Sequence, residues 1–300
     1  MKEQNHSQPL SATKRLPPWL RQPLKNTEQV LALKKSLKAR HLHTVCQSAG
    51  CPNIAECFKR PTAAFMILGD RCTRHCRFCG VDKGNPDPLD PDEPRRVAEM
   101  ASILELKHVV ITSVTRDDLD DGGAAHFNRT IRAIRRQLPG ASIEALIPDF
   151  RGDQDCLDTV MSAGPDVLNH NVETVPRLYA EVRPEADFTR SLAVLHYVYS
   201  TYPGTMVKSG IMTGLGEQED ELRYVFRALL DAGCSALTIG QYLSPSRHHY
   251  PVKKYVHPDR FKEYHNDASA MGFQWVSAGP NVRSSYHADD MVTTRKGVTK

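Results

Sequence analysis

No run of apolar residues in this 300-residue sequence comes near the roughly 18 that a helix needs to cross a bilayer, which excludes a membrane-spanning protein. The excess of one charge sign is also small, since the chain has 39 basic and 35 acidic residues and a formal net charge of +4. So small an excess argues against nucleic acid as the main ligand, while a mildly acidic protein partner stays compatible. Residues 1–30 lack the apolar core of a secretory signal and the arginine-rich, acid-poor character of a transit peptide. We therefore expect a cytoplasmic protein.

Cysteine is the residue type that carries the functional signal, with eight in the chain. The cytoplasm keeps thiols reduced, so these cysteines indicate metal or catalytic chemistry before disulfides. Six of them form two triads, which are Cys46, Cys51 and Cys57, and then Cys72, Cys76 and Cys79. Cys156 and Cys234 lie in helical patterns among apolar residues, so we expect them to be buried core thiols and not ligands.

The chain changes character near residue 60. Residues 1–60 are rich in proline, lysine and glutamine, with one expected helix over residues 27–42 and no strand pattern. From Thr62 onward, short apolar or β-branched runs alternate with amphipathic stretches, which is typical of βα units around a parallel sheet. The expected strands cover residues 64–68, 108–113, 142–147, 166–171, 205–212 and 236–242. The expected helices cover residues 93–106, 123–138, 153–163, 188–202 and 217–232, with another after Pro258.

Six such units predict an α/β fold, a partial (β/α)6 TIM-like barrel. A full eight-stranded barrel typically uses roughly 250 residues, whereas these strands occupy only residues 64–242. A doubly wound sheet is the alternative. We divide the chain into an N-terminal extension (1–60), the barrel (61–275) and a C-terminal extension (276–300) that contains the tetrapeptide RSSY.

The second triad follows the first expected strand, at the carboxyl end of the sheet, where parallel α/β folds build their sites. A cubane 4Fe–4S cluster normally takes four thiolates, so Cys72, Cys76 and Cys79 would leave one iron without a protein ligand. The spacing C-x3-C-x2-C resembles the signature of radical S-adenosylmethionine (SAM) enzymes. A zinc knuckle with His75 as fourth ligand is the alternative, disfavoured because structural zinc usually draws on two separated ligand pairs.

The resemblance implies that the open iron binds the amino and carboxylate groups of SAM. Reductive cleavage of SAM then gives a 5′-deoxyadenosyl radical that removes hydrogen from unactivated carbon, while the protein supplies position and shielding. Phe78 matches the aromatic residue that lies near the adenine in this superfamily. A core aromatic is the alternative interpretation of Phe78.

The first triad narrows the resemblance. The spacing C-x4-C-x5-C, the tripeptide CPN and the pair Glu56–Cys57 resemble the lipoyl synthases, as do ITSVTRDDLDDGGA at 111–124 and RSSY within 281–290. This similarity covers about residues 16–290 and implies a second, auxiliary 4Fe–4S cluster carried by the two extensions. Its ligands would be Cys46, Cys51, Cys57 and a serine of RSSY, either Ser284 or Ser285, of which the resemblance favours Ser285 as the catalytically important ligand.

For such an enzyme the auxiliary cluster is the sulfur source and is consumed. The implied reaction inserts sulfur at C6 and C8 of a protein-bound octanoyl chain, with one SAM for each insertion. The implied partners are octanoylated lipoyl domains of 2-oxoacid dehydrogenase E2 subunits and the glycine-cleavage H protein, a flavodoxin or ferredoxin electron donor, and iron–sulfur carrier proteins that rebuild the cluster.

Further SAM contacts are expected at other strand ends. GIMTGLGE (210–217) resembles the radical SAM pattern G-x-I-x-G-x-x-E, with Met212 where an aliphatic residue contacts adenine, although a strand-to-helix turn would look the same. Two polar residues after the fourth strand are expected at the SAM amine or ribose, with helix capping as the alternative: Asn171 and Glu173. Five more are expected to face SAM or the octanoyl-lysine, with surface ion pairs as the alternative: Thr112, Ser113, Arg116, Asp117 and Arg183.

Two rival functions remain compatible with the sequence. One is another two-cluster radical SAM enzyme that inserts sulfur or methylthio groups into a different substrate. The other is a zinc-stabilised binding module that uses both triads structurally. Iron content and activity on an octanoylated protein separate the three hypotheses.

Overall fold

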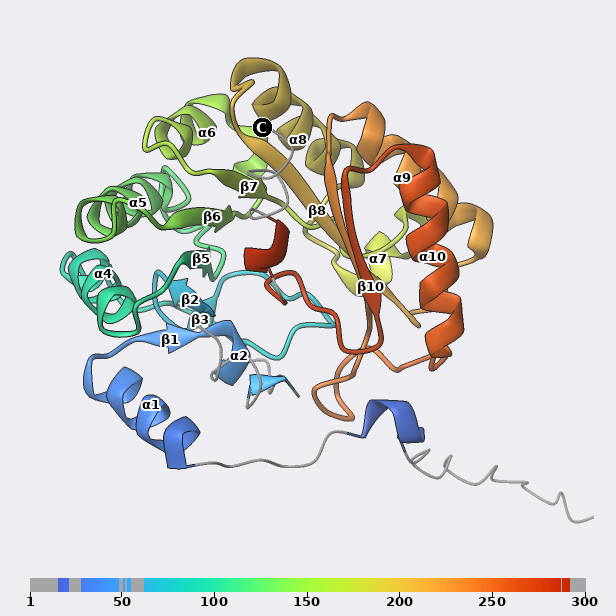
Figure 1. The fold of residues 1–300 in the computed structure, drawn as a ribbon, viewed down its shortest axis with the longest axis horizontal. Coiled ribbons are helices and arrows are strands. Elements are labelled where there is room, and N and C mark those ends of the chain that lie inside the picture. The colour runs from blue at the N-terminus through green and yellow to red at the C-terminus, as the bar shows by residue number, and fades with distance from the viewer. Residues whose placement is uncertain are drawn as a thin grey trace, which may run out of the picture.

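A single curved sheet forms the framework of the protein. The computed structural model describes residues 16–21, 28–48, 51, 53–54, 62–286 and 288–291. Within that part the sheet has eight strands in the order β1-β2-β5-β6-β7-β8-β9-β10 (Figure 1). They are β1 (His43–Thr44), β2 (Thr62–Ile67), β5 (His108–Ser113), β6 (Ser142–Leu146), β7 (Val167–Asn169), β8 (Met206–Thr213), β9 (Ala236–Gln241) and β10 (Trp275–Gly279). The strands from β2 onward pair in parallel, and β1 pairs antiparallel with β2. A separate ribbon joins β3 (Arg71–Cys72) to β4 (Asp82–Lys83).

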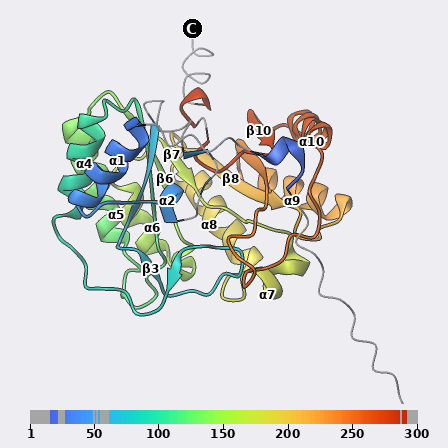
Figure 2. The same ribbon diagram turned by 90° about the horizontal axis from the view of Figure 1, so that it is seen from below.

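The described helices are α1 (Glu28–Ala39), α2 (Val45–Ser48), α4 (Glu93–Ile103), α5 (Ala124–Gln137), α6 (Gln154–Met161), α7 (Tyr179–Val182), α8 (Phe188–Thr201), α9 (Glu219–Asp231) and α10 (Pro258–Met271), with 3-10 turns at Pro18–Leu20, Phe150–Gly152 and Pro176–Leu178. The larger helices cover the outer, convex side of the sheet, whereas α2 lies on its inner side, where Val45 packs with Ala64 and Val110 (Figure 1). Figures 1 and 2 show α4 and α5 towards one end of the arc and α9 and α10 towards the other. None of the described helices is long and apolar enough to cross a membrane.

The expected partial barrel is confirmed, because each of the six predicted strands corresponds to a strand of the sheet and the major helices line its outside. The structure adds two strands. β1 contradicts the expectation that residues 1–60 contain no strand, since only two residues pair and so short a segment has no periodicity. β10 adds a seventh parallel strand. Its first residue, Trp275, is the last residue of the predicted barrel range, 61–275. Its residues are only half-buried, so the segment WVSAG has no continuous apolar run.

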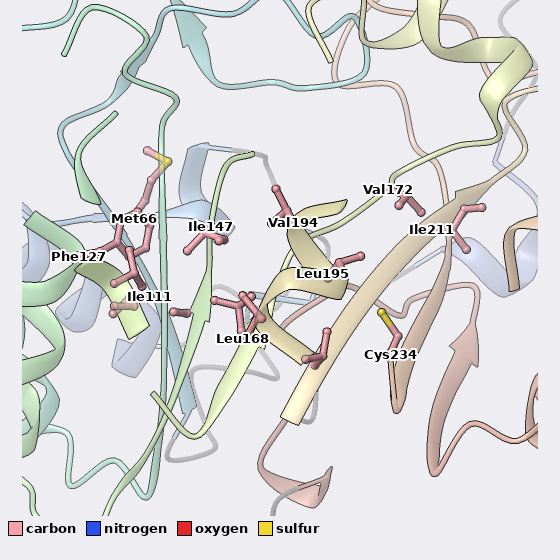
Figure 3. Packing of buried hydrophobic residues seen from close by; sticks show 14 of the residues in the cluster. Met66, Ile111, Phe127, Ile147, Leu168, Val172, Val194, Leu195, Ile211 and Cys234 are labelled. Carbon is pink, nitrogen blue, oxygen red and sulfur yellow. The ribbon is translucent and has the colours of Figure 1, made fainter. Parts of the chain in front are cut away.

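Side chains on the outer face of the strands pack beneath the helices. Ile111, Leu168 and Ile211 belong to one buried cluster with Phe127 of α5 and Leu195 of α8 (Figure 3). Burial of each such side chain contributes about 1.5–3 kcal/mol relative to exposure. Two free thiols are buried in the same cluster, which confirms the prediction that they are core residues: Cys156 and Cys234.

The inner face of the sheet is partly filled by the chain's own C-terminal segment. After β10 the chain turns back inside the arc, where the last described residues lie between the strands (Figure 1). Met291 packs with Val167 and Met206, the first residues of β7 and β8, and Ala288 packs with Ala64 and Val110. Alternation along the strands therefore places one set of side chains under the helices and the other set against the C-terminal segment.

Candidate active site

A cavity of about 1320 Å³ opens on the inner face, lined largely by residues at the carboxyl ends of the strands. It brings together side chains that are far apart in the sequence. Its lining includes Cys46 and Cys51 of the first triad and all three cysteines of the second. Both serines of RSSY, Ser284 and Ser285, line it from the C-terminal turn (residues 282–286). Cys57 lies outside the described residues.

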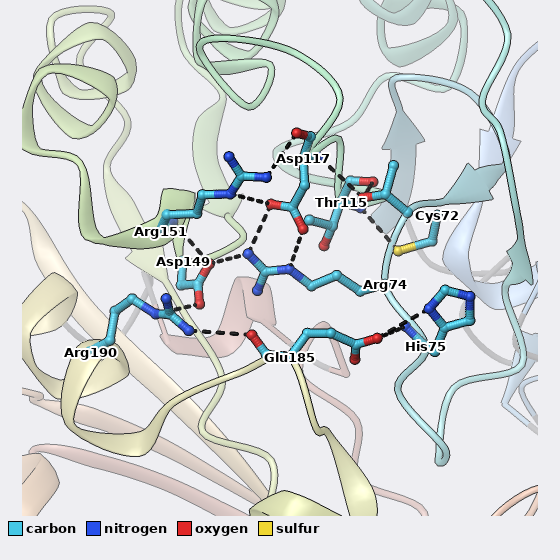
Figure 4. Close-up of polar contacts among 10 residues, drawn as sticks. Cys72, Arg74, His75, Thr115, Asp117, Asp149, Arg151, Glu185 and Arg190 are labelled. Carbon is cyan, nitrogen blue, oxygen red and sulfur yellow. Dashed lines mark hydrogen bonds and ion pairs between the residues drawn. The ribbon is translucent and has the colours of Figure 1, made fainter.

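The loop that carries the second triad is anchored by a buried arginine. Arg74 donates from Nε and Nη2 to both carboxylate oxygens of Asp117, at 2.6 and 3.0 Å, and from Nη2 to Asp149 Oδ1 at 2.7 Å (Figure 4). Arg190 lies 3.0 Å from the other oxygen of Asp149. Burial would raise the pKa of Asp149, but the hydrogen bond and charge of Arg74 lower it to about 2. The loop is thereby held to the ends of two neighbouring βα units by ionised groups with little access to solvent.

Backbone bonds on both sides of the triad complete this anchorage. The amide of Thr115 donates to Cys72 Sγ at 3.3 Å, and the amide of Arg77 donates to the carbonyl of Val182 at 2.8 Å. In the segment between β9 and α10, His249 Nε2 lies 3.1 Å from the carbonyl oxygen of Cys79. The three thiols therefore face the cavity from a loop whose backbone is tied to several elements.

His75 is not a plausible fourth metal ligand. Its Nδ1 lies 3.1 Å from Glu185 Oε1 and its side chain is 66% exposed (Figure 4). Across the part of the chain that the structure describes, no three His, Cys, Asp or Glu side chains are arranged to hold one metal ion. A zinc knuckle needs such convergence. A cubane presents four separate iron atoms, so its thiolates need not converge on one ion.

Two thiols of the second triad, those of Cys76 and Cys79, are enclosed and neutral in the metal-free protein. Burial raises the pKa of Cys76 to about 12 and also raises the pKa of Cys79. A thiol in such surroundings ionises only when a metal supplies compensating positive charge. The donor set therefore fits an iron–sulfur cluster better than a reactive free thiolate.

Cys46 and Cys51 of the first triad lie in a more electropositive setting. The amide of Cys51 donates to the carbonyl of Cys46 at 2.9 Å. Asn53 Nδ2 donates to the carbonyl of Asn281 at 2.5 Å, which connects the N-terminal loop to the residue just before the C-terminal turn. A hydrogen bond from Cys46 is the main cause that lowers the pKa of Cys51 to about 6, and the charge of Arg283 adds to it. A half-buried guanidinium beside these sulfurs fits an anionic cluster with thiolate ligands.

The two serines of RSSY differ in their surroundings. The hydroxyl of Ser284 donates to Asn171 Oδ1 at 2.7 Å, and its carbonyl accepts from Lys208 Nζ at 2.7 Å. No described residue forms a hydrogen bond with the Ser285 hydroxyl, which lines the cavity. Ser285 is consequently the serine whose oxygen is available to a metal.

The predicted SAM-binding residues after β7 form one charged group. Asn171 Nδ2 donates to Glu173 Oε1 at 3.1 Å, and Arg183 Nη1 donates to the carbonyls of Asn171 and Val172, each at 2.9 Å. Asn171 therefore joins Glu173 to Ser284 instead of capping a helix. Glu173 has a φ of 64°, a left-handed conformation that is strained for this residue and typical of binding sites. Burial raises the pKa of Glu173, and Nε of Arg183 has no hydrogen-bond partner among the described residues.

Four more of the predicted contacts line the cavity, whereas Arg116 and Asp117 do not and instead form ion pairs with Asp118 and Arg74. Phe78 and Met212 are half-buried and pack against the main core, so they present apolar surface to a ligand. Thr112 is buried, and the Ser113 hydroxyl is buried without a hydrogen-bond partner in the described part of the chain. An unsatisfied buried hydroxyl beside a cavity is what a polar ligand would complete.

The GIMTGLGE segment forms a strand-to-helix turn, as its alternative interpretation proposed. The carboxylate of Glu217 accepts hydrogen bonds from the amides of Gly214, Leu215 and Gly216 at 2.6, 2.9 and 3.0 Å. Gly214 and Gly216 have φ values of 94° and 110°, which favour glycine. Glu217 thus shapes the turn that follows Met212.

Several polar residues that support the site were missed from sequence. They are Arg74, Glu144, Asp149, Asn169 and Lys208, each 7% exposed or less. A charged residue within an apolar strand pattern, such as Lys208 in MVKSGIMT or Glu144 in SIEAL, was the available signal, because a charge is buried only when it is paired.

A family model and curated relatives both match this chain. Residues 66–229, more than half of the chain, match the model of the radical SAM superfamily. The lipoyl synthase of Caldanaerobacter subterraneus subsp. tengcongensis is 54% identical over 95% of this chain and 100% of its own length. That of Nitratidesulfovibrio vulgaris (strain Hildenborough) is 52% identical over 93% of each chain.

Solved structures share the fold at low sequence identity. Streptococcus suis SuiB bound to S-adenosylmethionine has a TM-score of 0.57 at 12% identity, over 75% of this chain and 53% of that one. Methylornithine synthase has a TM-score of 0.54 at 14% identity, over 79% and 81%. These two structures support the architecture described above.

Proposed function

The chain belongs to the lipoyl synthase family of the radical SAM superfamily, and we propose that it inserts sulfur at C6 and C8 of a protein-bound octanoyl chain. The product is the lipoyl group, which carries two sulfur atoms. The observation that carries the proposal is one cavity, lined by cysteines of both triads and by the RSSY serines. Two clusters at one cavity allow hydrogen removal and sulfur delivery to act on the same carbon.

The radical half of the reaction uses the second triad. Cys72, Cys76 and Cys79 would hold a 4Fe–4S cluster, and three thiolates would leave one iron for SAM. Glu173 and Nε of Arg183, which has no hydrogen-bond partner among the described residues, would offer opposite charges to the SAM amine and carboxylate. The apolar surface nearby would receive the adenine. When bound, this cluster with SAM supplies a carbon radical that removes hydrogen, and the auxiliary cluster supplies sulfide.

The sulfur half uses the first triad. We assign Cys46, Cys51, Cys57 and Ser285 as ligands of the auxiliary cluster. Two observations support this assignment. Arg283 lies near Cys51, and the Ser285 hydroxyl lines the cavity without a hydrogen bond to any described residue. A serine alkoxide is more easily protonated and lost than a thiolate, which suits a cluster that must give up its sulfides.

The partners follow from the chemistry. The substrate is an octanoylated protein, and we propose the lipoyl domains of 2-oxoacid dehydrogenase E2 subunits and the glycine-cleavage H protein. A flavodoxin or ferredoxin would supply electrons, and iron–sulfur carrier proteins would rebuild the consumed cluster. The cytoplasmic location and the division into residues 1–60, 61–275 and 276–300 stay predictions.

The test uses the full chain, reconstituted anaerobically and mixed with SAM, dithionite and an octanoyl-lysine peptide. Mass spectrometry should show the peptide gain two sulfur atoms, while 5′-deoxyadenosine accumulates. Formation of 5′-deoxyadenosine without any sulfur on the peptide would favour a different substrate. Purified protein that holds zinc and no iron would favour the structural binding module.

A further inference from the structure

The C-terminal turn at residues 282–286 lies against the inner face of the sheet at two glycines. A Cβ atom added to Gly240 would clash with the carbonyl oxygen of Val282. A Cβ added to Gly210 would stand 2.6 Å from Thr238 Oγ1 on β9, 2.8 Å from Asn171 Oδ1 and 3.1 Å from Ser284 Oγ. Neither glycine has a positive φ, so each is required for space and not for its backbone conformation.

Beneath this turn a lysine is buried inside the barrel. Lys208 on β8 is fully buried, and its Nζ lies 2.9 and 3.0 Å from the two carboxylate oxygens of Glu144 on β6. The same ammonium donates to the carbonyl oxygen of Ser284 at 2.7 Å and lies 5.6 Å from the centre of the Trp275 ring. One buried cation thus links a strand on one side of the barrel to the C-terminal turn.

Two asparagines hold the Ser284 side chain from the same side. Asn169 Nδ2 donates to Glu144 at 2.8 Å and lies 3.4 Å from the Ser284 hydroxyl, which itself donates to Asn171 at 2.7 Å. Ser284 is therefore fixed through both its backbone and its side chain. The next residue, Ser285, lines the cavity without being held by any described side chain.

Stability alone does not account for this arrangement. Burying an ammonium and a carboxylate costs several kcal/mol of desolvation, and apolar replacements of similar size are often equally stable. We infer that Gly210, Gly240, Lys208, Glu144 and Asn169 are positioning residues that form a seat for the C-terminal turn and set where Ser285 meets the auxiliary cluster. This inference rests on the proposed role of Ser285 as an iron ligand.

The first test needs no metal. In the metal-free full chain, Gly240→Ala should speed amide hydrogen exchange of residues 282–286 by about tenfold, equal to about 1.4 kcal/mol of lost local protection. Gly279→Ala is the matched control, because its Cβ would meet only the end of the Val282 side chain at 3.3 Å. Equal exchange in both variants and wild type would overturn the proposed seat.

A second variant guards against simple misfolding of the first. The pair Glu144→Gln with Lys208→Met removes both charges together, so neither partner stays buried and unpaired. It should keep a cooperative unfolding transition yet show the same faster exchange at residues 282–286. A cooperative variant with wild-type exchange there would show that Lys208 does not hold the turn.

The final test examines the reconstituted protein by Mössbauer spectroscopy. Gly240→Ala should alter the auxiliary-cluster signal in the same way as Ser285→Ala, and the double variant should match either single one. Separate, additive changes would show that Gly240 does not act through Ser285. If wild type and Ser285→Ala give identical spectra, the proposed ligand role fails, while the exchange data still report on the seat.

Discussion

Arg74 and Asp149 meet at 2.7 Å although they stand 75 residues apart in the chain. The arginine lies between two cysteines of the second triad, and the aspartate follows β6. Both side chains are almost fully buried, so their interaction is little screened by water. The site therefore depends on a contact that joins the cluster loop to the barrel.

Replacement of Asp149 by alanine should destabilise the protein strongly. The change leaves buried positive charge on Arg74 and Arg190 without one of its partners, which typically costs about 3 kcal/mol or more. Urea unfolding of the metal-free protein measures the loss. The exposed pair of Arg223 and Asp267 provides the control, because Asp267→Asn should cost less than about 1 kcal/mol. Equal losses for both variants would contradict the anchoring role.

Removal of one cysteine from the second triad should remove one cluster and spare the other. Cys72→Ala is expected to lower iron content from about eight to about four atoms per chain, since two cubanes hold four irons each. Iron analysis after anaerobic reconstitution measures this change. Cys234→Ala is the matched control, because its thiol is buried in the core and should leave iron content near eight. An unchanged iron count in Cys72→Ala would exclude Cys72 as a ligand.

Ser285→Ala should separate the two halves of the reaction. SAM cleavage depends on the second triad, so 5′-deoxyadenosine should still form, while sulfur insertion into an octanoyl peptide should be suppressed. Ser284→Ala removes the hydrogen bond to Asn171 and should lower stability by about 1 kcal/mol, with the smaller effect on sulfur insertion. Mass spectrometry of the peptide compares the two variants. Wild-type lipoyl yield from Ser285→Ala would transfer the ligand role to Ser284.

Stability should fall in mild acid because of His170. Burial lowers the pKa of His170 to about 4 from 6.5, with its Nδ1 2.9 Å from the carbonyl oxygen of Ile147. The unfolded chain takes up this proton below pH 6.5 and the folded chain does not. Stability is therefore complete above pH 6.5 and is lost as the pH falls towards 4, by about 3 kcal/mol in total. Urea unfolding of metal-free protein between pH 7.5 and 5 measures the slope, and His170→Gln should flatten it.

The local sequence was sufficient to predict the six barrel strands and one cluster-binding loop. The six barrel strands follow from apolar runs, and the spacing of Cys72, Cys76 and Cys79 follows from the need of one cluster for ligands from one loop. β10 was missed because its half-buried residues lack an apolar run. Arg116 was expected near the ligand but instead pairs with Asp118 and does not line the cavity.

The sequence by itself determined the chemistry: which thiols exist, how they are spaced, and that they follow a strand of a parallel sheet. Only the tertiary structure decided which polar residues hold those groups in place, because contacts such as Arg74 with Asp149 or Lys208 with Ser284 join distant segments and leave no periodic pattern. It also distinguished Ser285 from Ser284. Two adjacent serines are equivalent as letters, and they differ only because folding ties one hydroxyl to Asn171 and leaves the other facing the cavity.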